Sequence, residues 1–157
     1  MIYFISDNSN MDKAVLNLFK NDPNFNCVFL RNNEQKGPGA TRNLGLQNSY
    51  NDYILFLDAD DLFIKPTALE ELYNTGLNYS VNLFSMYNRN NISKSSALIK
   101  REFLQKNNLK YKEIFFSEDD EFLIQVLSKC SLNEIFEYNN SENLFIEYNA
   151  SSGNNVT

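Results

Sequence analysis

Three carboxylates follow an apolar run in the middle of the chain. The run spans residues 53–57, and Asp58, Asp60 and Asp61 come directly after it. Open α/β sheets bind ligands beyond the carboxyl ends of their strands, and carboxylates at this spacing can converge on one Mg²⁺ or Mn²⁺ whose shell substrate phosphates complete. The alternative is a solvated acidic turn. Because three acidic side chains repel one another unless a positive group offsets them, the sequence favours the metal site.

Two other polar segments suit the same chemistry. Residues 33–45 carry glycines that permit close approach of the backbone, and Arg42 can offer a planar fork to a diphosphate. The alternative there is a plain connection between a strand and a helix. Residues 116–121 place acidic side chains at a predicted helix start, where the helix dipole already favours them, so capping is the alternative. Ser117 and Asp120 have the spacing of a capping box for that helix.

The absence of histidine and the net charge exclude several classes of protein. Without histidine, catalysis by Ser-His-Asp or Cys-His groups and zinc sites built on histidine are excluded. The net charge is -6 and no run of Lys or Arg forms a stripe, so we expect no nucleic-acid partner. Acid, base and metal-binding functions therefore fall mostly to carboxylates.

Cysteine usage and hydropathy predict the compartment. Cys27 and Cys130 sit singly inside apolar runs, as buried thiols do in a reducing compartment. The longest apolar stretches are far shorter than the ~20 residues of a membrane helix, and the first residues carry no charged leader. We expect a cytoplasmic protein without a signal peptide or anchor. Peripheral attachment to the inner face of the plasma membrane is the alternative location.

The elements that must position these residues alternate between strands and helices. Apolar runs of strand length and stretches with one apolar helical face follow each other in turn. In order they predict a strand at 2–5, a helix at 14–19, a strand at 27–30, a helix through Arg42 and Leu46, a strand at 53–57, a helix at 66–73 and a strand at 81–87. Fully apolar strands such as the one at 53–57 are typical of a buried parallel sheet. The sequence therefore predicts an α/β domain with a mostly parallel sheet flanked by helices.

After Tyr87 the pattern loosens. Residues 88–95, rich in Asn and Ser, predict a loop. The elements expected beyond it are a strand at 97–99, a helix at 101–106, a helix beginning after Ser117, and strands at 135–138 and 144–148.

Taken in order, the polar segments resemble the motifs of the family 2 glycosyltransferases, which have the GT-A fold. Residues 5–10 resemble a strand end followed by Asp-Asp-Gly-Ser-Thr, and residues 37–45 resemble a Gly…Ala-Arg-Asn-x-Gly segment. Residues 56–61 resemble the Asp-x-Asp-Asp metal motif, and residues 117–119 the Glu-Asp motif of the catalytic base. The tail at 144–152 is similar to a late strand with a tyrosine before a small polar stretch.

The resemblance implies one GT-A-like, Rossmann-like domain over residues 1–157. Residues 1–87 would form the nucleotide-sugar-binding half, and residues 88–157 the half that holds the acceptor and the catalytic base. The family normally opens with a further strand and helix that touch the nucleobase. Because this sequence begins at the next strand, we expect the usual first strand-helix unit to be lacking, and a homodimer or a partner chain to complete the pocket.

The same resemblance implies the reaction and its donor contacts. The expected activity is metal-dependent, inverting transfer of a sugar from a nucleoside-diphosphate sugar, with a UDP-sugar favoured, to an acceptor hydroxyl during glycan or polysaccharide synthesis. Asp7 would bind the nucleobase or ribose, Arg42 the diphosphate and Asp58 the ribose. Asn43 and Glu118 complete the expected substrate-binding set.

Metal binding and proton transfer fall to other carboxylates in this scheme. Asp60 and Asp61 would hold Mn²⁺ or Mg²⁺ at the phosphates, and Asp119 would take the proton from the acceptor hydroxyl. A cation is the direct means of stabilising a departing nucleoside diphosphate. The acceptor would be a glycan or a lipid-linked sugar.

Two other functions remain open at this point. Residues 54–60 also resemble the nucleophile strand of haloacid dehalogenase-like phosphatases, with Asp58 attacking phosphate and Asp60 protonating the leaving group. Against this, Leu62 stands where that motif has Thr or Val, and the motif lies far from the N-terminus. The second alternative is a non-catalytic or degenerate module that binds a nucleotide sugar.

Overall fold

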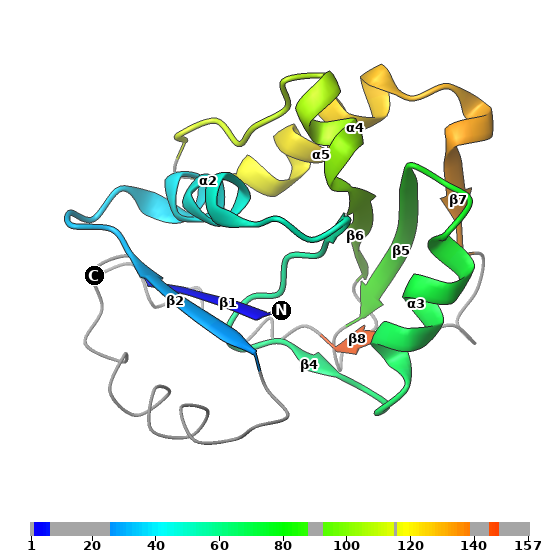
Figure 1. The fold of residues 1–157 in the computed structure, drawn as a ribbon, viewed down its shortest axis with the longest axis horizontal. Coiled ribbons are helices and arrows are strands. Elements are labelled where there is room, and N and C mark those ends of the chain that lie inside the picture. The colour runs from blue at the N-terminus through cyan, green and yellow to red at the C-terminus, as the bar shows by residue number, and fades with distance from the viewer. Residues whose placement is uncertain (1, 7–25, 88–92, 115, 139–144, 148–157) are drawn as a thin grey trace.

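The computed structural model describes residues 2–6, 26–87, 93–114, 116–138 and 145–147 (Figure 1). The strands are β1 (Ile2–Ser6), β2 (Cys27–Arg31), β3 (Tyr53–Ile54), β4 (Leu62–Phe63), β5 (Val81–Tyr87), β6 (Ser93–Lys100), β7 (Ile135–Glu137) and β8 (Ile146–Glu147). The helices are α2 (Gly37–Asn48), α3 (Ala68–Gly76), α4 (Arg101–Lys106) and α5 (Glu118–Lys129), with a 3-10 turn at Leu132–Glu134.

The strands form two sheets, and the larger one is mixed. β1 and β2 pair in parallel, whereas the six-stranded sheet has the order β3-β6-β5-β8-β4 with β7 also paired to β5. In the larger sheet β5 is antiparallel to β6 and parallel to β7 and β8, and the β3–β6 and β4–β8 pairs are antiparallel. The predicted α/β class is confirmed, but the prediction of a mostly parallel sheet is wrong. The chain returns from β5 to β6 within residues 88–92, and a connection this short permits only an antiparallel pair.

The strand that leads to the acidic turn is shorter than its apolar run. It was predicted over 53–57, but β3 ends at Ile54, and Leu57 is 41% exposed. Among the described residues, β3 pairs only with β6, at Ile99 and Lys100, so no second strand extends the ladder to the end of the run. Residues 55–58 therefore lead from the sheet to the site without belonging to a strand.

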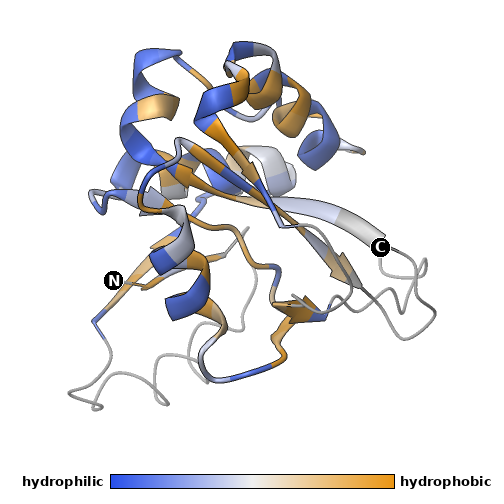
Figure 2. Cartoon of the chain, turned by 90° about the vertical axis from the view of Figure 1, so that its right-hand side faces the viewer, coloured by the Kyte–Doolittle hydropathy of each residue, from blue (hydrophilic) through white to orange (hydrophobic). Residues whose placement is uncertain are grey.

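Helices cover both faces of the β5–β6 pair, with α3 on one face and α4 and α5 on the other (Figure 1). Side chains alternate along a strand, and β6 follows that rule: Ala97 and Ile99 pack toward α4 and α5, whereas Leu98 packs toward α3. Apolar residues lie along the strands and on the helix faces that pack against the sheet (Figure 2). Two apolar clusters thus hold the sheet between the helices.

The helix ends agree with the helix dipole more than with capping side chains. α5 has acidic residues throughout its first turn and Lys129 in its last turn, and α4 has Glu102 in its first turn and Lys106 in its last, which are favourable positions for these charges. The predicted capping box at Ser117 is wrong, because Ser117 takes a left-handed conformation (φ 55°) and its side chain makes no cap bond. A capping box is instead formed by Ser131 and Glu134 at the 3-10 turn.

Most of the other predicted elements are confirmed. The strands at 2–5, 27–30, 81–87 and 135–138 and the helices at 42–46, 66–73 and 101–106 are present with small shifts at their ends. The loop predicted at 88–95 is wrong at its end, since residues 93–95 already belong to β6 and pair with β5. The predicted helix at 14–19 and most of the tail at 144–152 lie outside the described residues.

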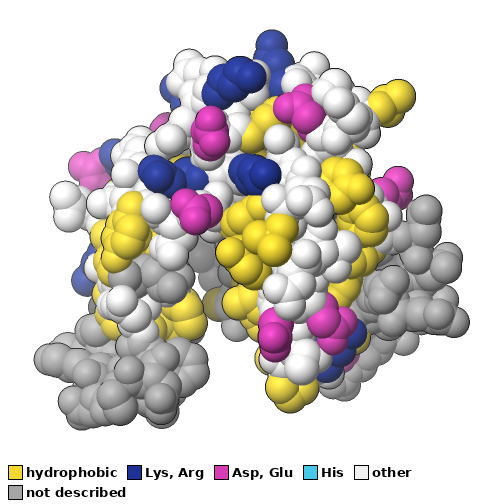
Figure 3. All heavy atoms as spheres, turned by 45° about the vertical axis from the view of Figure 1, so that its right-hand side comes forward, with side chains coloured by type: hydrophobic (Ala, Val, Ile, Leu, Met, Phe, Trp, Pro, Cys, Tyr) yellow, Lys and Arg dark blue, Asp and Glu magenta, His cyan; other side chains and the backbone are white. Residues whose placement is uncertain are grey.

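The surface carries charges of both signs close together. Figure 3 shows Lys and Arg side chains interspersed with Asp and Glu on one face, with exposed hydrophobic side chains beside them. Within the described part of the chain, no helix has the length and apolar character needed to cross a membrane.

Candidate active site

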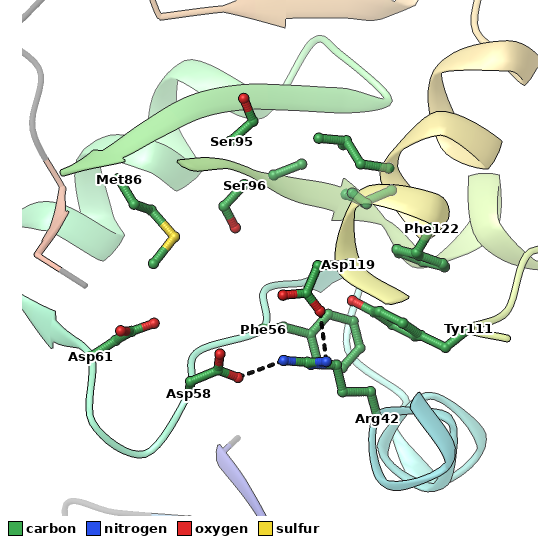
Figure 4. A pocket seen from close by; sticks show the side chains of 13 residues that line it. Arg42, Phe56, Asp58, Asp61, Met86, Ser95, Ser96, Tyr111, Asp119 and Phe122 are labelled. Atoms are coloured by element: carbon green, nitrogen blue, oxygen red, sulfur yellow. Dashed lines mark hydrogen bonds and ion pairs between the residues drawn. The ribbon is translucent and has the colours of Figure 1, made fainter. Parts of the chain in front are cut away.

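The acidic turn after β3 is tight. The N–H of Asp61 donates to the carbonyl oxygen of Asp58 at 3.1 Å, which closes the turn on itself. Asp58 and Asp61 are partly buried, whereas Asp60 between them is exposed. The side chain of Asp58 leaves the turn toward Arg42 (Figure 4).

Arg42 is the centre of the site. From α2 its Nη2 donates to Asp58 Oδ1 at 2.7 Å, and its Nη1 donates to Glu118 Oε1 at 2.6 Å. The same Nη1 forms an ion pair with Asp119 Oδ1 at 2.6 Å. One guanidinium therefore joins α2, the acidic turn and the first two residues of α5 (Figure 4).

Burial and charge act in opposite directions on Arg42. Its side chain is 12% exposed, and burial by itself lowers the pKa of the guanidinium. The carboxylates of Asp58 and Asp119 more than offset that effect, so the pKa of Arg42 lies above its ordinary value. The guanidinium thus stays charged and supplies the positive group that three neighbouring carboxylates need.

An aromatic cluster packs against the Arg42 guanidinium. The Arg42 guanidinium carbon lies 5.4 Å from the centroid of the Tyr111 ring, within the range of a cation–π contact. Tyr111 stacks on Phe122 of α5 with ring centroids 4.0 Å apart and meets Phe56 edge-on at 5.2 Å. Burial raises the pKa of the Tyr111 hydroxyl, so this ring stays neutral beside the charges.

The segment that carries Tyr111 is bound directly to α2. The Asn43 side-chain amide donates to the Tyr111 carbonyl at 2.9 Å and accepts from the Tyr111 N–H at 2.8 Å. Gly39 approaches the same segment so closely that a Cβ there would overlap the Lys112 carbonyl oxygen. The glycine and the asparagine of the motif thus fix the position of Arg42 between them.

The charged network opens into a cavity between the acidic turn, β6 and the start of α5. Asp58, Asp61 and Asp119 line it together with Arg42, and Ser96 of β6 directs its hydroxyl toward it (Figure 4). The remaining lining residues are Phe56, Met86, Ser95, Ala97, Ile99, Tyr111, Phe122 and Leu123. A carboxylate at a helix start, an acidic turn across from it and a strand hydroxyl thus share one space.

The structure brings most of the predicted site residues together. Arg42, Asp58, Glu118 and Asp119 form one network, and Asp61 lines the same cavity. Asn43 lies beside them, with its amide bound to the backbone at Tyr111. Asp60 is exposed and is not among the cavity-lining residues, and Asp7 lies outside the described residues. Their roles toward substrate and metal stay predictions.

The carboxylates of the acidic turn do not converge on one point. Where the structure describes the chain, no group of three or more Asp, Glu, Cys or His side chains could hold a metal ion. The expectation that Asp58, Asp60 and Asp61 converge is therefore wrong, because Arg42 draws Asp58 away. Asp60 and Asp61 remain as oxygen donors, and Mg²⁺ commonly uses one or two carboxylates together with substrate phosphates. The remaining donor set fits such a shared site.

Two participants were missed by the sequence analysis. Tyr111 lies in the polar connection before α5, where an aromatic residue is the only signal of a buried ring. Ser96 is a polar residue in a strand whose next three positions, residues 97–99, are apolar and buried. A small polar side chain at the edge of such a run could have indicated contact with a cavity.

Comparison with known proteins identifies the class. The sequence pattern described as Glycosyl transferase family 2 matches residues 1–133. The chain therefore belongs to this family, and the resemblance seen in its motifs is confirmed. Its fold is the GT-A fold of that family's solved structures.

The curated relatives that match most of the chain are bacterial. Over 87% of this chain it is 25% identical to the poly(ribitol-phosphate) beta-N-acetylglucosaminyltransferase TarP of Staphylococcus aureus, covering 51% of that protein. Over 89% of this chain it is 29% identical to the GalNAc(5)-diNAcBac-PP-undecaprenol beta-1,3-glucosyltransferase of Campylobacter jejuni, covering 47% of that protein. The chain thus spans about half the length, or less, of the curated relatives that it matches.

Solved structures with the same fold include nucleotide complexes. Residues 1–349 of S. aureus TarS in complex with UDP align with a TM-score of 0.74 and 17% identity, covering 92% of this chain and 49% of that one. The mannosyltransferase PcManGT of Pyrobaculum calidifontis, in complex with GDP-Man and Mn²⁺, aligns with a TM-score of 0.73 and 14% identity. It covers 98% of this chain and 48% of that one.

Proposed function

We propose that this chain carries the active site of a metal-dependent, inverting glycosyltransferase. The observation that carries the proposal is that Asp119, at the start of α5, shares one cavity with Asp58 and Asp61 of the acidic turn. A base for the acceptor and carboxylates for the donor then lie on different sides of one space, as a displacement at the anomeric carbon requires. The proposed donor is a UDP-sugar and the proposed acceptor a hydroxyl of a glycan or of a lipid-linked sugar.

In the proposed reaction Asp119 acts as the general base. Its carboxylate accepts the proton of the acceptor hydroxyl while that oxygen forms a bond to the anomeric carbon. The bond from the anomeric carbon to the diphosphate oxygen breaks with its electron pair on the leaving group, and the configuration inverts. A positioned base typically contributes a factor of roughly 10² to 10⁴ to the rate.

The donor side of the proposal uses the acidic turn. Asp60 and Asp61 would hold Mn²⁺ or Mg²⁺, which when bound supplies positive charge to the diphosphate as it departs. Asp58 would contact the ribose and Asp7 the nucleobase or ribose. UDP bound to TarS and GDP-Man with Mn²⁺ bound to PcManGT support a nucleotide donor and a divalent cation.

The names of the relatives support inversion and a bacterial glycan. TarP and the C. jejuni enzyme are both named for β-linked transfer, the outcome expected when an α-linked nucleotide sugar reacts with inversion. One acts on a poly(ribitol-phosphate) and the other on an undecaprenol-linked glycan, as their names state. Polymer and lipid-linked acceptors are therefore the two acceptor classes to test.

The division of the chain and its location belong to the same proposal. Residues 1–87 would bind the nucleotide sugar, and residues 88–157 would supply the base and the acceptor surface, in the cytoplasm or at the inner face of the plasma membrane. Within the described residues β1 pairs only with β2, so its other edge can accept a strand from a second copy or a partner. Light scattering at high concentration tests this, and a fully active monomer would refute it.

The decisive experiment is a donor screen. The purified chain is incubated with UDP-GlcNAc, UDP-Glc, UDP-GalNAc or GDP-Man, with Mn²⁺ or EDTA, and with a polyol-phosphate or lipid-linked acceptor, and free nucleotide and product are measured. We expect transfer from a UDP-sugar that requires the cation. Metal-dependent UDP binding without transfer from any donor would favour the non-catalytic binding module instead.

The phosphatase alternative lacks support in the site. Its nucleophile would be Asp58, whose carboxylate is bound to Arg42, and the family match points to a glycosyltransferase. We expect no phosphate release from p-nitrophenyl phosphate above background. Turnover that is lost in Asp58→Asn would restore that alternative.

A further inference from the structure

Arg42 lines the cavity but is largely enclosed by other groups of the protein. Its two terminal nitrogens contact Asp58, Glu118 and Asp119 at 2.6 to 2.7 Å, and its face lies over the ring of Tyr111. Only 12% of the side chain is exposed. A diphosphate that took the place of one of these carboxylates would have to displace it from a contact of 2.6 to 2.7 Å.

The formal charges oppose such an exchange. One guanidinium faces three carboxylates, so the group carries an excess of negative charge before any substrate enters. A diphosphate that replaced Glu118 or Asp119, whose side chains are 10% and 26% exposed, would add negative charge and leave that carboxylate without its cation. Removing one partner from a buried charge pair is strongly unfavourable.

The attachment of α2 fixes the backbone from which the Arg42 side chain extends. The residues on either side of it in the helix are fixed, since Thr41 donates to the Gly37 carbonyl at 2.9 Å and Asn43 binds both peptide groups of Tyr111. Tyr111 in turn stacks on Phe122 of α5. The backbone of Arg42 and helix α5 are thus held in fixed relative positions by these contacts.

The start of α5 depends on this arginine. Ser117, the residue before the helix, contributes no side-chain cap, and its φ of 55° is one that a serine rarely adopts. The residues that Arg42 binds, Glu118 and Asp119, are the first two of the helix. The guanidinium does not cap the backbone N–H groups, but it holds the side chains of the first two residues of the helix.

We infer that Arg42 is a positioning residue for Asp119 and not a ligand of the donor diphosphate. Its planar fork holds the carboxylate of Asp119 at the cavity through α5, with Glu118 as the second anchor and Asp58 as the tie to the acidic turn. The inference rests on the proposed function, in which Asp119 is the base. It also makes a claim about the free protein that no substrate is needed to test.

The experiment replaces Arg42 by lysine, which keeps the charge but loses the fork. Hydrogen exchange of the free protein is measured by mass spectrometry, and UDP affinity with Mn²⁺ by calorimetry. We expect exchange of the amides from Glu121 onward, which donate to the carbonyls of the first turn of α5, to become about tenfold faster, because a charge-assisted hydrogen bond that holds this turn is lost. We expect the dissociation constant of UDP to change by less than about threefold, and kcat to fall by about 10², as for a displaced catalytic group.

Arg101→Lys is the matched control. Arg101 is another half-buried arginine, and its Nε donates to the Asn51 carbonyl away from the cavity. Its replacement should change neither α5 exchange nor kcat. If Arg42→Lys does not fold, Glu118→Gln replaces it, and exchange in α5 should again become faster.

The inference would be overturned by the opposite pair of results for α5 exchange and UDP affinity. Unchanged exchange at α5 together with UDP binding weakened tenfold or more would make Arg42 a diphosphate ligand. Failure of the proposed function has a different signature, since a wild-type chain without transferase activity would leave the exchange result intact. The two failures are therefore distinguishable.

Discussion

Asp119 reaches the cavity while paired to Arg42, with 2.6 Å between Oδ1 and Nη1. The ion pair joins a helix near the middle of the chain's first half to a helix near the start of its last quarter. A carboxylate next to a fixed cation has a strong preference for one orientation, which a general base needs before its substrate arrives.

Asp119→Asn separates catalysis from structure. We expect UDP affinity to stay nearly intact while the transfer rate falls by roughly 10² to 10⁴, because the amide cannot accept the proton. The control is Asp120→Asn, an exposed residue of the same turn, which should keep most of the activity. Transfer at the wild-type rate by the Asp119 variant would remove this residue from the mechanism.

Asp60→Asn combined with Asp61→Asn tests the metal donors. With both carboxylates neutral, we expect Mn²⁺ to lose its effect on UDP binding, since both proposed protein ligands of the cation lose their charge. Calorimetric titration of UDP with Mn²⁺ and with EDTA measures the difference. Equal UDP affinity of the wild type in the two buffers, or metal-dependent binding that survives the double substitution, would contradict the assignment.

Asn43→Ala tests the link between α2 and the Tyr111 segment. Two hydrogen bonds to backbone groups at a buried residue are lost, so we expect the free energy of unfolding to fall by about 1–3 kcal/mol. Asn48→Ala is the control, because Asn48 is exposed on the same helix and bonds only to the Leu44 carbonyl in its own helix. Urea denaturation compares the two. Equal losses would mean that the link adds no stability.

Cys130 gives a prediction about alkaline pH. Burial, aided by Glu134, raises the pKa of its thiol from 9.0 to about 11 in the folded protein. The folded state therefore holds this proton more tightly than the unfolded state, so its contribution to stability is complete below pH 9 and is lost as the pH rises toward 11. We expect the wild type to lose stability relative to Cys130→Ala over that window. A constant difference between the two in urea denaturation from pH 8 to 11 would show that the thiol is not perturbed.

The sequence identified the charged groups of the site better than the way they meet. Asp58, Arg42 and Asp119 were each assigned to the site from their motifs, and the structure brings all three together. The sequence could not show that the positive charge of Arg42 is already balanced by carboxylates of the same chain, because that depends on contacts between residues far apart in the chain. For the same reason the sequence analysis gave Asp58 and Arg42 separate contacts with the nucleotide sugar, although the two side chains are bound to each other.

The fold shows the same division between local and distant information. Apolar runs and helix faces predicted the elements at 2–5, 81–87 and 101–106 correctly, because these patterns are local. Strand direction depends on which strands become neighbours, and the sheet is mixed where a parallel one was expected. The apolar run at 53–57 likewise predicted burial, yet among the described residues only Tyr53 and Ile54 of this run pair with another strand.

The arginine also limits how members of this family can be recombined. A chimera that joins residues 1–87 of this chain to the later half of a relative separates Arg42 and Asp58 from the two acidic residues that complete their network. An active chimera therefore requires that Arg42, Asp58 and the first turn of α5 come from the same protein, together with the ring of Tyr111 that packs against the guanidinium.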